Sequence, residues 1–152
     1  MEKKMSVMGI GHKAGAVILL YLVVVFGLGR IFSPFFRITG THYNTLLITG
    51  IILIVVGFAT NLAAAFTMLK AHKNGKLATK GLYAVFLNPM YTLQLFITVP
   101  GLTLLFNSWI VLTTIIAAII TIKVFVKEEE KYLENTFGDE YREYRKRVLI
   151  KF

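Results

Sequence analysis

The sequence alternates long apolar stretches with short polar connections. A helix of about 20 residues crosses the hydrocarbon core of a bilayer. Four stretches have a suitable length, at residues 14–36, 45–69, 89–106 and 109–126, and a charged tail at 127–152 follows them. The pattern predicts an all-α integral membrane protein with about four transmembrane helices, built as a single membrane domain over residues 1–152.

The tail predicts a helix, a turn and a second helix. One apolar and aromatic stripe recurs every three or four positions, at Leu133, Phe137, Tyr141, Tyr144 and Val148. Gly138 is a candidate stop for the helix that leaves the membrane, because glycine adopts a left-handed conformation at little cost. Asp139 is a candidate N-cap for the second helix. The stripe alone fits an amphipathic helix resting on the membrane surface equally well.

Small and polar residues within the stretches predict how the helices pack. Gly50 and Gly57 give the second stretch small faces that allow close approach, and such faces would also permit a homodimer. Pro100 predicts a kink or interruption in the third stretch. Asn61 and Gln94 are polar, so we expect them to face protein rather than lipid.

Composition supports a membrane protein. Hydrophobic residues make up 56% of the chain and the mean hydropathy is +0.67, so a soluble domain of this size would expose much of its apolar content. Intrinsic disorder is excluded, because that state needs low hydrophobicity. The absence of cysteine excludes a disulfide scaffold, thiol catalysis and thiolate metal sites.

The net charge of +9 is unevenly distributed, and the lysines predict an orientation. Apart from Glu2, every acidic residue lies after Lys127. Lysines concentrate before the first stretch, in the 70–80 connection and in the tail, whereas the alternate connections carry only Arg30 and Arg37. By the positive-inside rule, both termini and the 70–88 connection face the cytoplasm. The expected location is a prokaryotic cell membrane.

Several kinds of chemistry are disfavoured. The three histidines are far apart in sequence, and His42 falls on the opposite side of the membrane from the others, so no metal site is expected. The sequence has no phosphate-binding loop or dinucleotide fingerprint. Basic residues without a folded basic module do not predict nucleic-acid binding. An acid-free body also disfavours a four-helix proton-coupled transporter.

Two polar segments on the cytoplasmic side could carry chemistry. One runs from Lys76 to Tyr91, where Asn88 and Pro89 match an N-cap followed by proline at the first helical position. The other is the run of three glutamates at 128–130, which in isolation fits a solvated helix face. Successive helical residues point about 100° apart, so at least one glutamate should face the bundle.

Both segments resemble a known family. Residues 81–91, GLYAVFLNPMY, resemble the G-x-Y-x-x-x-R-H-P-x-Y segment of the isoprenylcysteine carboxyl methyltransferase family. Residues 129–144, EEKYLENTFGDEYREY, resemble that family's E-E-x-x-L-x-x-x-F-G-x-E-Y-x-x-Y. The likeness covers roughly the C-terminal half of the chain. It departs from the family at Leu87 and Asn88, which replace the Arg-His pair, and at Leu93, which replaces a glycine.

The resemblance implies a membrane methyltransferase that uses S-adenosylmethionine, releases S-adenosylhomocysteine and needs no metal. A lipophilic acceptor would reach the cytoplasmic membrane face sideways from the surrounding lipid. The implied cofactor-binding residues are Leu77, Ala78, Gly81, Tyr83, Asn88, Pro89, Tyr91, Glu129, Glu130, Tyr141 and Tyr144. Asn88 and Glu129 are the candidate catalytic residues.

The residue types suit this cofactor. Carboxylates accept charge-assisted hydrogen bonds from an ammonium or ribose group, and tyrosine faces attract cations. Methyl transfer depends mainly on positioning the acceptor. Losing the family arginine at Leu87 removes a bidentate carboxylate partner, so we expect an acceptor other than a prenylcysteine carboxylate handled in the family's way. It could be another membrane-soluble amine, hydroxyl, thiol or carboxylate, with Lys80 or a tail arginine as a replacement cation.

Three alternatives stay open at the sequence level. The same fold could bind cofactor, or act as a scaffold, without turnover. A small four-helix transporter is the second alternative. The third is a membrane reductase that uses a nicotinamide cofactor, since sterol reductases have a similar C-terminal signature, although this chain is short for that role.

Overall fold

The computed structural model describes residues 11–38 and 42–151, and these residues form helices and connections. The longer elements are α1 (Gly11–Ile31), α2 (Ser33–Phe36), α3 (Tyr43–Lys73), α4 (Pro89–Leu93), α5 (Val99–Leu105), α6 (Thr113–Phe137) and α7 (Asp139–Arg147). Two 3-10 helices, η1 (Gly81–Ala84) and η3 (Trp109–Leu112), and the π-helical turn η2 (Gln94–Thr98) complete the set. Within these described ranges the β structure is limited to two isolated bridges. The all-α prediction is confirmed.

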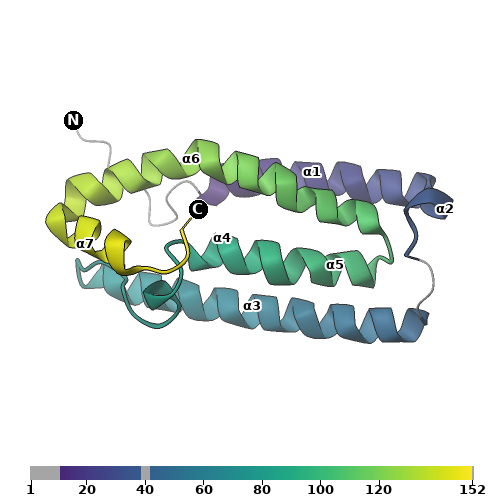
Figure 1. The fold of residues 1–152 in the computed structure, drawn as a ribbon, viewed down its shortest axis with the longest axis horizontal. Helices are drawn as coiled ribbons and strands as arrows, with labels where there is room; N and C mark the ends of the chain where they lie inside the picture. The colour runs from purple at the N-terminus through teal and green to yellow at the C-terminus, as the bar shows by residue number, and fades with distance from the viewer. Residues whose placement is uncertain (1–10, 39–41, 152) are drawn as a thin grey trace.

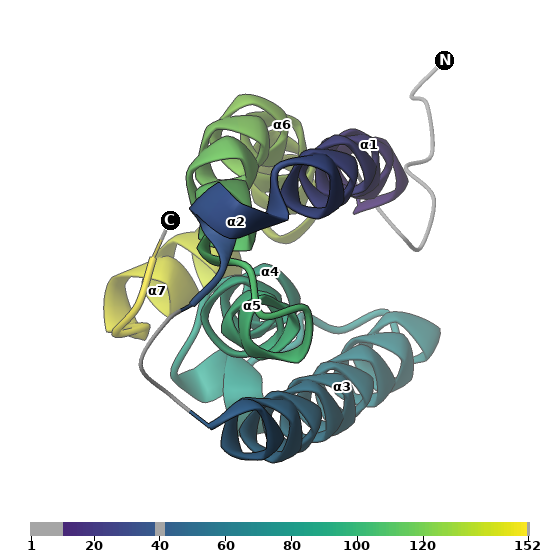
Figure 2. The same cartoon turned by 90° about the vertical axis from the view of Figure 1, so that its right-hand side faces the viewer.

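The long helices share one axis (Figure 1). Seen end-on, α4 and α5 lie between α3 on one side and the α1–α6 pair on the other (Figure 2). α5 packs on α3, and α1 packs on α6. α7 follows the end of α6 at the end of the bundle where α3 also ends, and the connection from α3 to α4 lies at this same end (Figure 1). The chain therefore brings its polar connections and its charged tail together.

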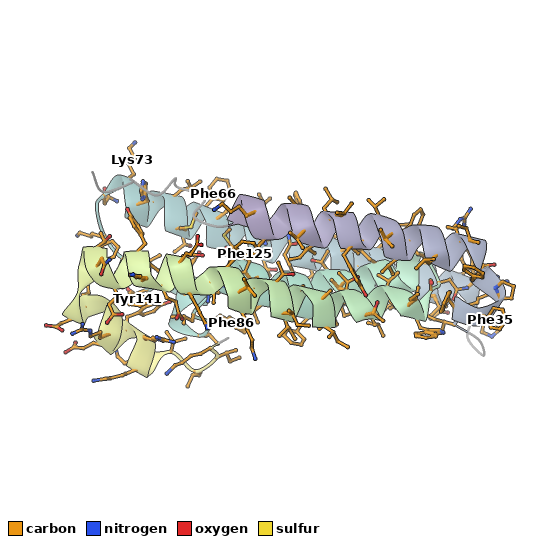
Figure 3. All side chains as sticks on the ribbon, turned by 90° about the horizontal axis from the view of Figure 1, so that it is seen from above. Phe35, Phe66, Lys73, Phe86, Phe125 and Tyr141 are labelled. Carbon is orange, nitrogen blue, oxygen red and sulfur yellow. The ribbon has the colours of Figure 1, made fainter. Side chains whose placement is uncertain are left out.

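Three helical segments are long and apolar enough to cross a membrane, by length and composition. They are Lys13–Ile31, Tyr43–Lys73 and Trp109–Phe137, and Pro89–Leu105 is a shorter apolar helix. Their outward side chains are largely apolar, and nitrogen- and oxygen-tipped sticks gather mainly at the end that holds Lys73 and Tyr141 (Figure 3). The chain is therefore an all-α membrane protein, as its sequence predicts.

The core lies between α1, α5 and α6. Its members are small or aliphatic and almost fully buried: Val25, Leu95, Val99, Val111, Ala118, Ile122 and Val126. At the end of the bundle opposite α7, Trp109 Nε1 donates to the Phe35 carbonyl at 3.1 Å, and its ring meets Phe36 edge-on at 5.2 Å. Aromatic side chains of this kind are typical of a membrane–water interface.

Proline changes two of the predicted stretches. The first stretch divides into α1 and α2, because Pro34 has no N–H to continue the helical bonding. In the third stretch the predicted interruption is present as the π-helical turn η2, directly before Pro100. Asn61 faces protein as predicted and donates to the Met90 carbonyl at 3.2 Å. The prediction for Gln94 is wrong: it is exposed at the start of η2, where the wider turn changes which positions face the interior.

Gly138 joins α6 to α7. It has a φ of +53°, a conformation that favours glycine, and its N–H donates to the Glu134 carbonyl at 2.8 Å. The predicted helix stop at Gly138 is thus confirmed. The prediction that Asp139 is the N-cap is wrong, because α7 begins at Asp139 itself and Gly138 occupies the capping position. The Asp139 carboxylate instead accepts a bond from Arg142 at 3.2 Å.

Glycines allow α3 to approach α5 and η2 closely, as the sequence predicts. A Cβ added to Gly50 would lie 2.7 Å from the Leu105 nitrogen and 2.9 Å from the Gly101 carbonyl oxygen. A Cβ on Gly57 would collide with the Thr98 hydroxyl. These two glycines are therefore occupied by contacts within the chain, and homodimer formation stays an untested prediction.

Gly50→Ala tests this close approach. The new methyl meets backbone atoms that cannot rotate away, so we expect a loss of about 1–3 kcal/mol in unfolding free energy. Gly27→Ala in α1 is the matched control, because nothing lies within 4 Å of its added Cβ. Thermal unfolding in detergent followed by circular dichroism compares the two. Equal stability of both variants would contradict the packing described.

Candidate functional site

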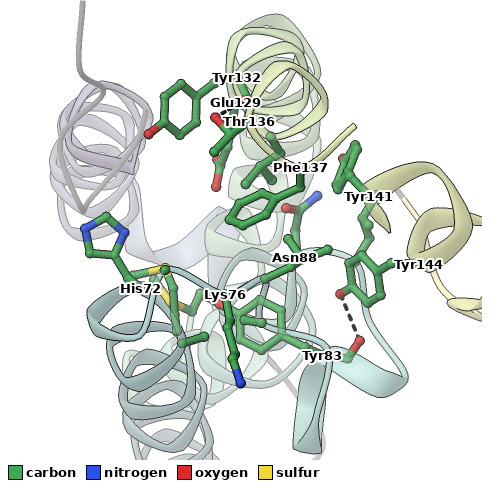
Figure 4. Close-up of a pocket in the computed structure, with 18 of the residues that line it drawn as sticks. His72, Lys76, Tyr83, Asn88, Glu129, Tyr132, Thr136, Phe137, Tyr141 and Tyr144 are labelled. Carbon is green, nitrogen blue, oxygen red and sulfur yellow. Dashed lines mark hydrogen bonds between the residues drawn. The ribbon is translucent and has the colours of Figure 1, made fainter. Parts of the chain in front are cut away.

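A pocket of about 430 Å³ lies at the polar end of the bundle (Figure 4). Its walls come from α3, the 74–88 connection, α4, α6 and α7. The lining residues are Met68, Ala71, His72, Gly75, Lys76, Leu77, Ala78, Tyr83, Leu87, Asn88, Met90, Tyr91, Glu129, Tyr132, Leu133, Thr136, Phe137, Tyr141 and Tyr144. Segments far apart in sequence thus share one cavity of a size typical for small ligands.

The wall that carries Tyr83 is held by α7. Gly81 has a φ of +62° and begins η1, the turn that carries Tyr83. The Tyr144 hydroxyl donates to the Tyr83 carbonyl at 2.9 Å, and the Tyr141 ring lies 6.3 Å from that of Tyr144 (Figure 4). The rest of this connection has little regular secondary structure. The hydrogen bond from Tyr144 therefore fixes the wall that carries Tyr83 against α7.

Glu129 places a carboxylate at the pocket. The Tyr91 hydroxyl donates to Glu129 Oε2 at 3.2 Å. In the described part of the chain no basic side chain forms an ion pair with Glu129. Its charge is therefore left to be balanced by something that enters the pocket.

The neighbouring glutamates face elsewhere. Glu128 is exposed and lies 3.9 Å from the Lys13 ammonium, and Glu130 forms an ion pair with Arg145 at 3.2 Å. One of the three glutamates lines the pocket, which confirms the prediction made from the helical rotation per residue. Glu130 does not line it and instead ties α6 to α7.

Two buried polar atoms of lining residues have no hydrogen-bond partner among the residues that the structure describes. They are Asn88 Nδ2 and the Tyr141 hydroxyl. Asn88 occupies the N-cap position of α4 and Pro89 the first turn, as predicted, yet the Asn88 side chain makes no capping bond. Its amide lies between Phe137 and Tyr141 in Figure 4. Leaving a buried donor unpaired costs about 1–3 kcal/mol, so a ligand that pairs with these atoms gains from both.

The pocket tyrosines are held in their protonated form. Burial raises the pKa of the Tyr83 phenol above its usual value, and the Glu129 carboxylate raises it further. Burial raises the pKa of Tyr144 to about 12. The pKa of Tyr141 is also raised, first by burial and then by the Glu130 carboxylate. At neutral pH these hydroxyls serve as hydrogen-bond donors rather than as bases.

Leu87 occupies the place of the family arginine and packs as an apolar residue. It is buried in a cluster with Tyr141, Tyr144 and Val148, and all of these except Val148 also line the pocket. The expected replacement cations are elsewhere: Lys80 and the tail arginines 142, 145 and 147 do not line the pocket, and Arg142 and Arg145 pair with acidic side chains. The cationic lining residue is Lys76, with His72 beside it on α3.

Most of the predicted site residues come together. The lining includes Leu77, Ala78, Tyr83, Asn88, Tyr91, Glu129, Tyr141 and Tyr144. Gly81, Pro89 and Glu130 are outside it and shape the turn, begin α4 and tie the tail, respectively.

Other lining residues were not predicted as site residues. Leu133 and Phe137 belong to the predicted apolar stripe of the tail, and with Thr136 they follow Glu129 at helical spacing, so extending the Glu129 face along α6 would have found all three. The α3 residues such as Met68 and His72 carry no local signal, because only the packing of α3 brings them there.

The comparisons with known proteins give the family. The model of the phospholipid methyltransferase family matches residues 41–140, more than half of the chain. No curated protein and no solved structure matches. The fold and the match together define a membrane methyltransferase class. The chain belongs to the phospholipid methyltransferase family, which confirms the family resemblance seen in the sequence.

Tyr144→Phe tests the anchoring bond. Removing the hydroxyl leaves the Tyr83 carbonyl without its donor, so the unfolding free energy should fall by about 0.5–1.5 kcal/mol. Tyr132→Phe is the control, because the Tyr132 hydroxyl also belongs to the pocket wall but makes no hydrogen bond in the described chain. Thermal unfolding in detergent measures both. A smaller loss for Tyr144→Phe than for Tyr132→Phe would refute the anchor.

Proposed function

We propose that this protein transfers a methyl group from S-adenosylmethionine to a lipophilic acceptor at the cytoplasmic membrane face. The observation that carries the proposal is the Glu129 carboxylate, which has no ion-pair partner among the described residues, in a tyrosine-rich pocket of a phospholipid methyltransferase family member. The cytoplasmic placement rests on the distribution of lysines along the sequence. The location in a prokaryotic cell membrane is an expectation from the sequence.

The lining residues fit the functional groups of this cofactor. Glu129 suits its ammonium or ribose hydroxyls, and Lys76 suits its carboxylate. The faces of Tyr83 and Tyr91 attract positive charge. The unpartnered Asn88 amide and Tyr141 hydroxyl offer further hydrogen bonds. When bound, S-adenosylmethionine supplies an electrophilic methyl group, and the protein supplies the surroundings.

The residues of the chain act mainly by positioning. The protonated tyrosines hold polar groups by hydrogen bonds, and the apolar lining of Leu133 and Phe137 excludes water from them. Glu129 is the acidic side chain that lines the pocket in the described structure, so it is the candidate for receiving an acceptor proton. Asn88 is placed to orient a reacting group through its amide.

Leu87 bears on the acceptor. Its burial in an apolar cluster supports an acceptor other than a prenylcysteine carboxylate bound by arginine. The acceptor class that we propose is a membrane-soluble amine, hydroxyl, thiol or carboxylate. Entry from the lipid is favoured by the position of the pocket, directly beside the apolar helix that begins at Pro89.

The same observation favours one rival function. A site without the Arg-His pair could bind cofactor, or serve as a scaffold, without turnover. Incubating the reconstituted protein with radiolabelled S-adenosylmethionine and a native lipid extract separates the two. Labelled lipid supports the enzyme. Cofactor binding with no labelled product supports the non-catalytic protein.

Glu129→Gln tests the cofactor site. Replacing the charged acceptor removes a charge-assisted bond worth about 1.5–3 kcal/mol, so the affinity for S-adenosylhomocysteine should fall about 10- to 150-fold. Glu128→Gln is the matched control, because this neighbour is exposed and lies outside the pocket. Calorimetric titration in detergent measures both. Equal affinities of the two variants would count against the proposed site.

Asn88→Ala separates ligand binding from helix capping. Its side chain makes no capping bond and leaves a buried donor unpaired, so we expect the thermal stability of the variant to equal or exceed that of the original protein. The affinity for S-adenosylhomocysteine should fall several-fold, and Asn88→Asp should bind differently again because it brings a second negative charge to the pocket. Lost stability with unchanged affinity would show that Asn88 is a structural residue.

A further inference from the structure

The segment after α7 is fixed against the pocket connection. Val148 is buried, and the chain then runs back along the bundle toward the start of α4 (Figure 1). The Leu87 N–H donates to the Ile150 carbonyl at 2.9 Å, and the Ile150 N–H donates to the Val85 carbonyl at 3.0 Å. These two backbone bonds hold the segment in one position.

This position leaves large apolar side chains uncovered. Leu149 is 80% exposed and Ile150 is 43% exposed, beside Val85 at 38%. We name these three residues the C-terminal patch. Burying a leucine fully is worth about 1.5–3 kcal/mol, and within the described chain Leu149 obtains little of this gain and Ile150 only part of it. Because the backbone is fixed and these side chains point outward, they are suited to contact an apolar phase outside the protein.

Cations without ion-pair partners flank the patch. Lys146, Arg147 and Lys151 are exposed, and within the described residues none of them forms an ion pair with an acidic side chain. The nearby Arg142 and Arg145 are instead neutralised by acidic residues. Each basic residue near an anionic lipid surface contributes about 1 kcal/mol.

The patch lies at the level where the membrane helices begin. Ile150 is bonded to Leu87, two residues before the apolar helix Pro89–Leu105 starts. Seen end-on, α7 lies to the side of α4 and α5 (Figure 2). A tail displaced sideways from a transmembrane bundle meets the lipid beside it.

We propose that residues 146–151 dock on the bilayer surface beside the bundle. Leu149 and Ile150 enter the boundary between headgroups and acyl chains, and Lys146, Arg147 and Lys151 contact anionic headgroups. The docking needs no methyl transfer. If the proposed function also holds, the same contact steadies Tyr141 and Tyr144, because Val148 packs with them in the pocket wall.

A spin label measures this docking directly. The chain has no cysteine, so Leu149→Cys gives a single labelling site. The Leu149 side chain is exposed, so we expect this substitution to leave the fold intact. Glu143→Cys, on the exposed surface of α7, is the control site. Both labelled proteins are reconstituted into nanodiscs of equimolar phosphatidylcholine and phosphatidylglycerol. Collision rates with oxygen, which concentrates in lipid, and with a water-soluble nickel chelate report the depth of each label.

We expect the oxygen-to-nickel ratio to be several-fold higher at position 149 than at position 143. The ratio at 149 should fall in nanodiscs of phosphatidylcholine alone, and in the triple variant Lys146→Gln, Arg147→Gln and Lys151→Gln. A ratio at 149 equal to that at 143 would overturn the proposal. Protection of the 149 label from both reagents would also overturn it, because that outcome indicates a protein partner or a second copy.

Discussion

A bilayer stabilises neither charges nor unpaired backbone groups, and this constraint organises the whole chain. Between Glu2 and Glu128 the sequence contains no acidic residue, so the helices that face lipid carry little that needs water. Every carboxylate in the described chain is delivered to one end of the bundle by α6 and α7. The pocket lies at this end, where the polar side chains come together.

Much of this arrangement was predictable, because membrane burial and helical period both leave a local signal. The apolar stretches predicted the long helices, Gly138 predicted the end of α6, and rotation along the helix predicted that at least one of the three glutamates faces inward. Pro100 predicted an interruption of the third stretch, but it did not predict that the interruption is a π-helical turn that leaves Gln94 exposed. The part of the pocket wall that α3 forms was not predictable either, because only the packing of α3 brings its residues there.

Leu87 and Asn88 show where family resemblance and structure add to each other. Motif comparison marks both positions as departures from the family pattern. The structure shows that the two departures differ in kind: Leu87 is absorbed into an apolar cluster, whereas the Asn88 amide stays unpartnered at the pocket. Apolar burial closes the first position to charge, and an unpaired donor keeps the second available to a ligand. This difference supports the proposal of a changed acceptor with a retained cofactor site.

The central claim is that the pocket between residues 76–91 and the end of α6 holds S-adenosylmethionine. The most direct measurement is ultraviolet cross-linking of cofactor carrying a radiolabelled methyl group, followed by peptide mapping of the reconstituted protein. The account predicts label in peptides from residues 76–91 or 129–144, displaced by excess S-adenosylhomocysteine. Label confined to α1 or to residues 43–60 of α3, which do not line the pocket, or label that the competitor does not displace, would contradict it.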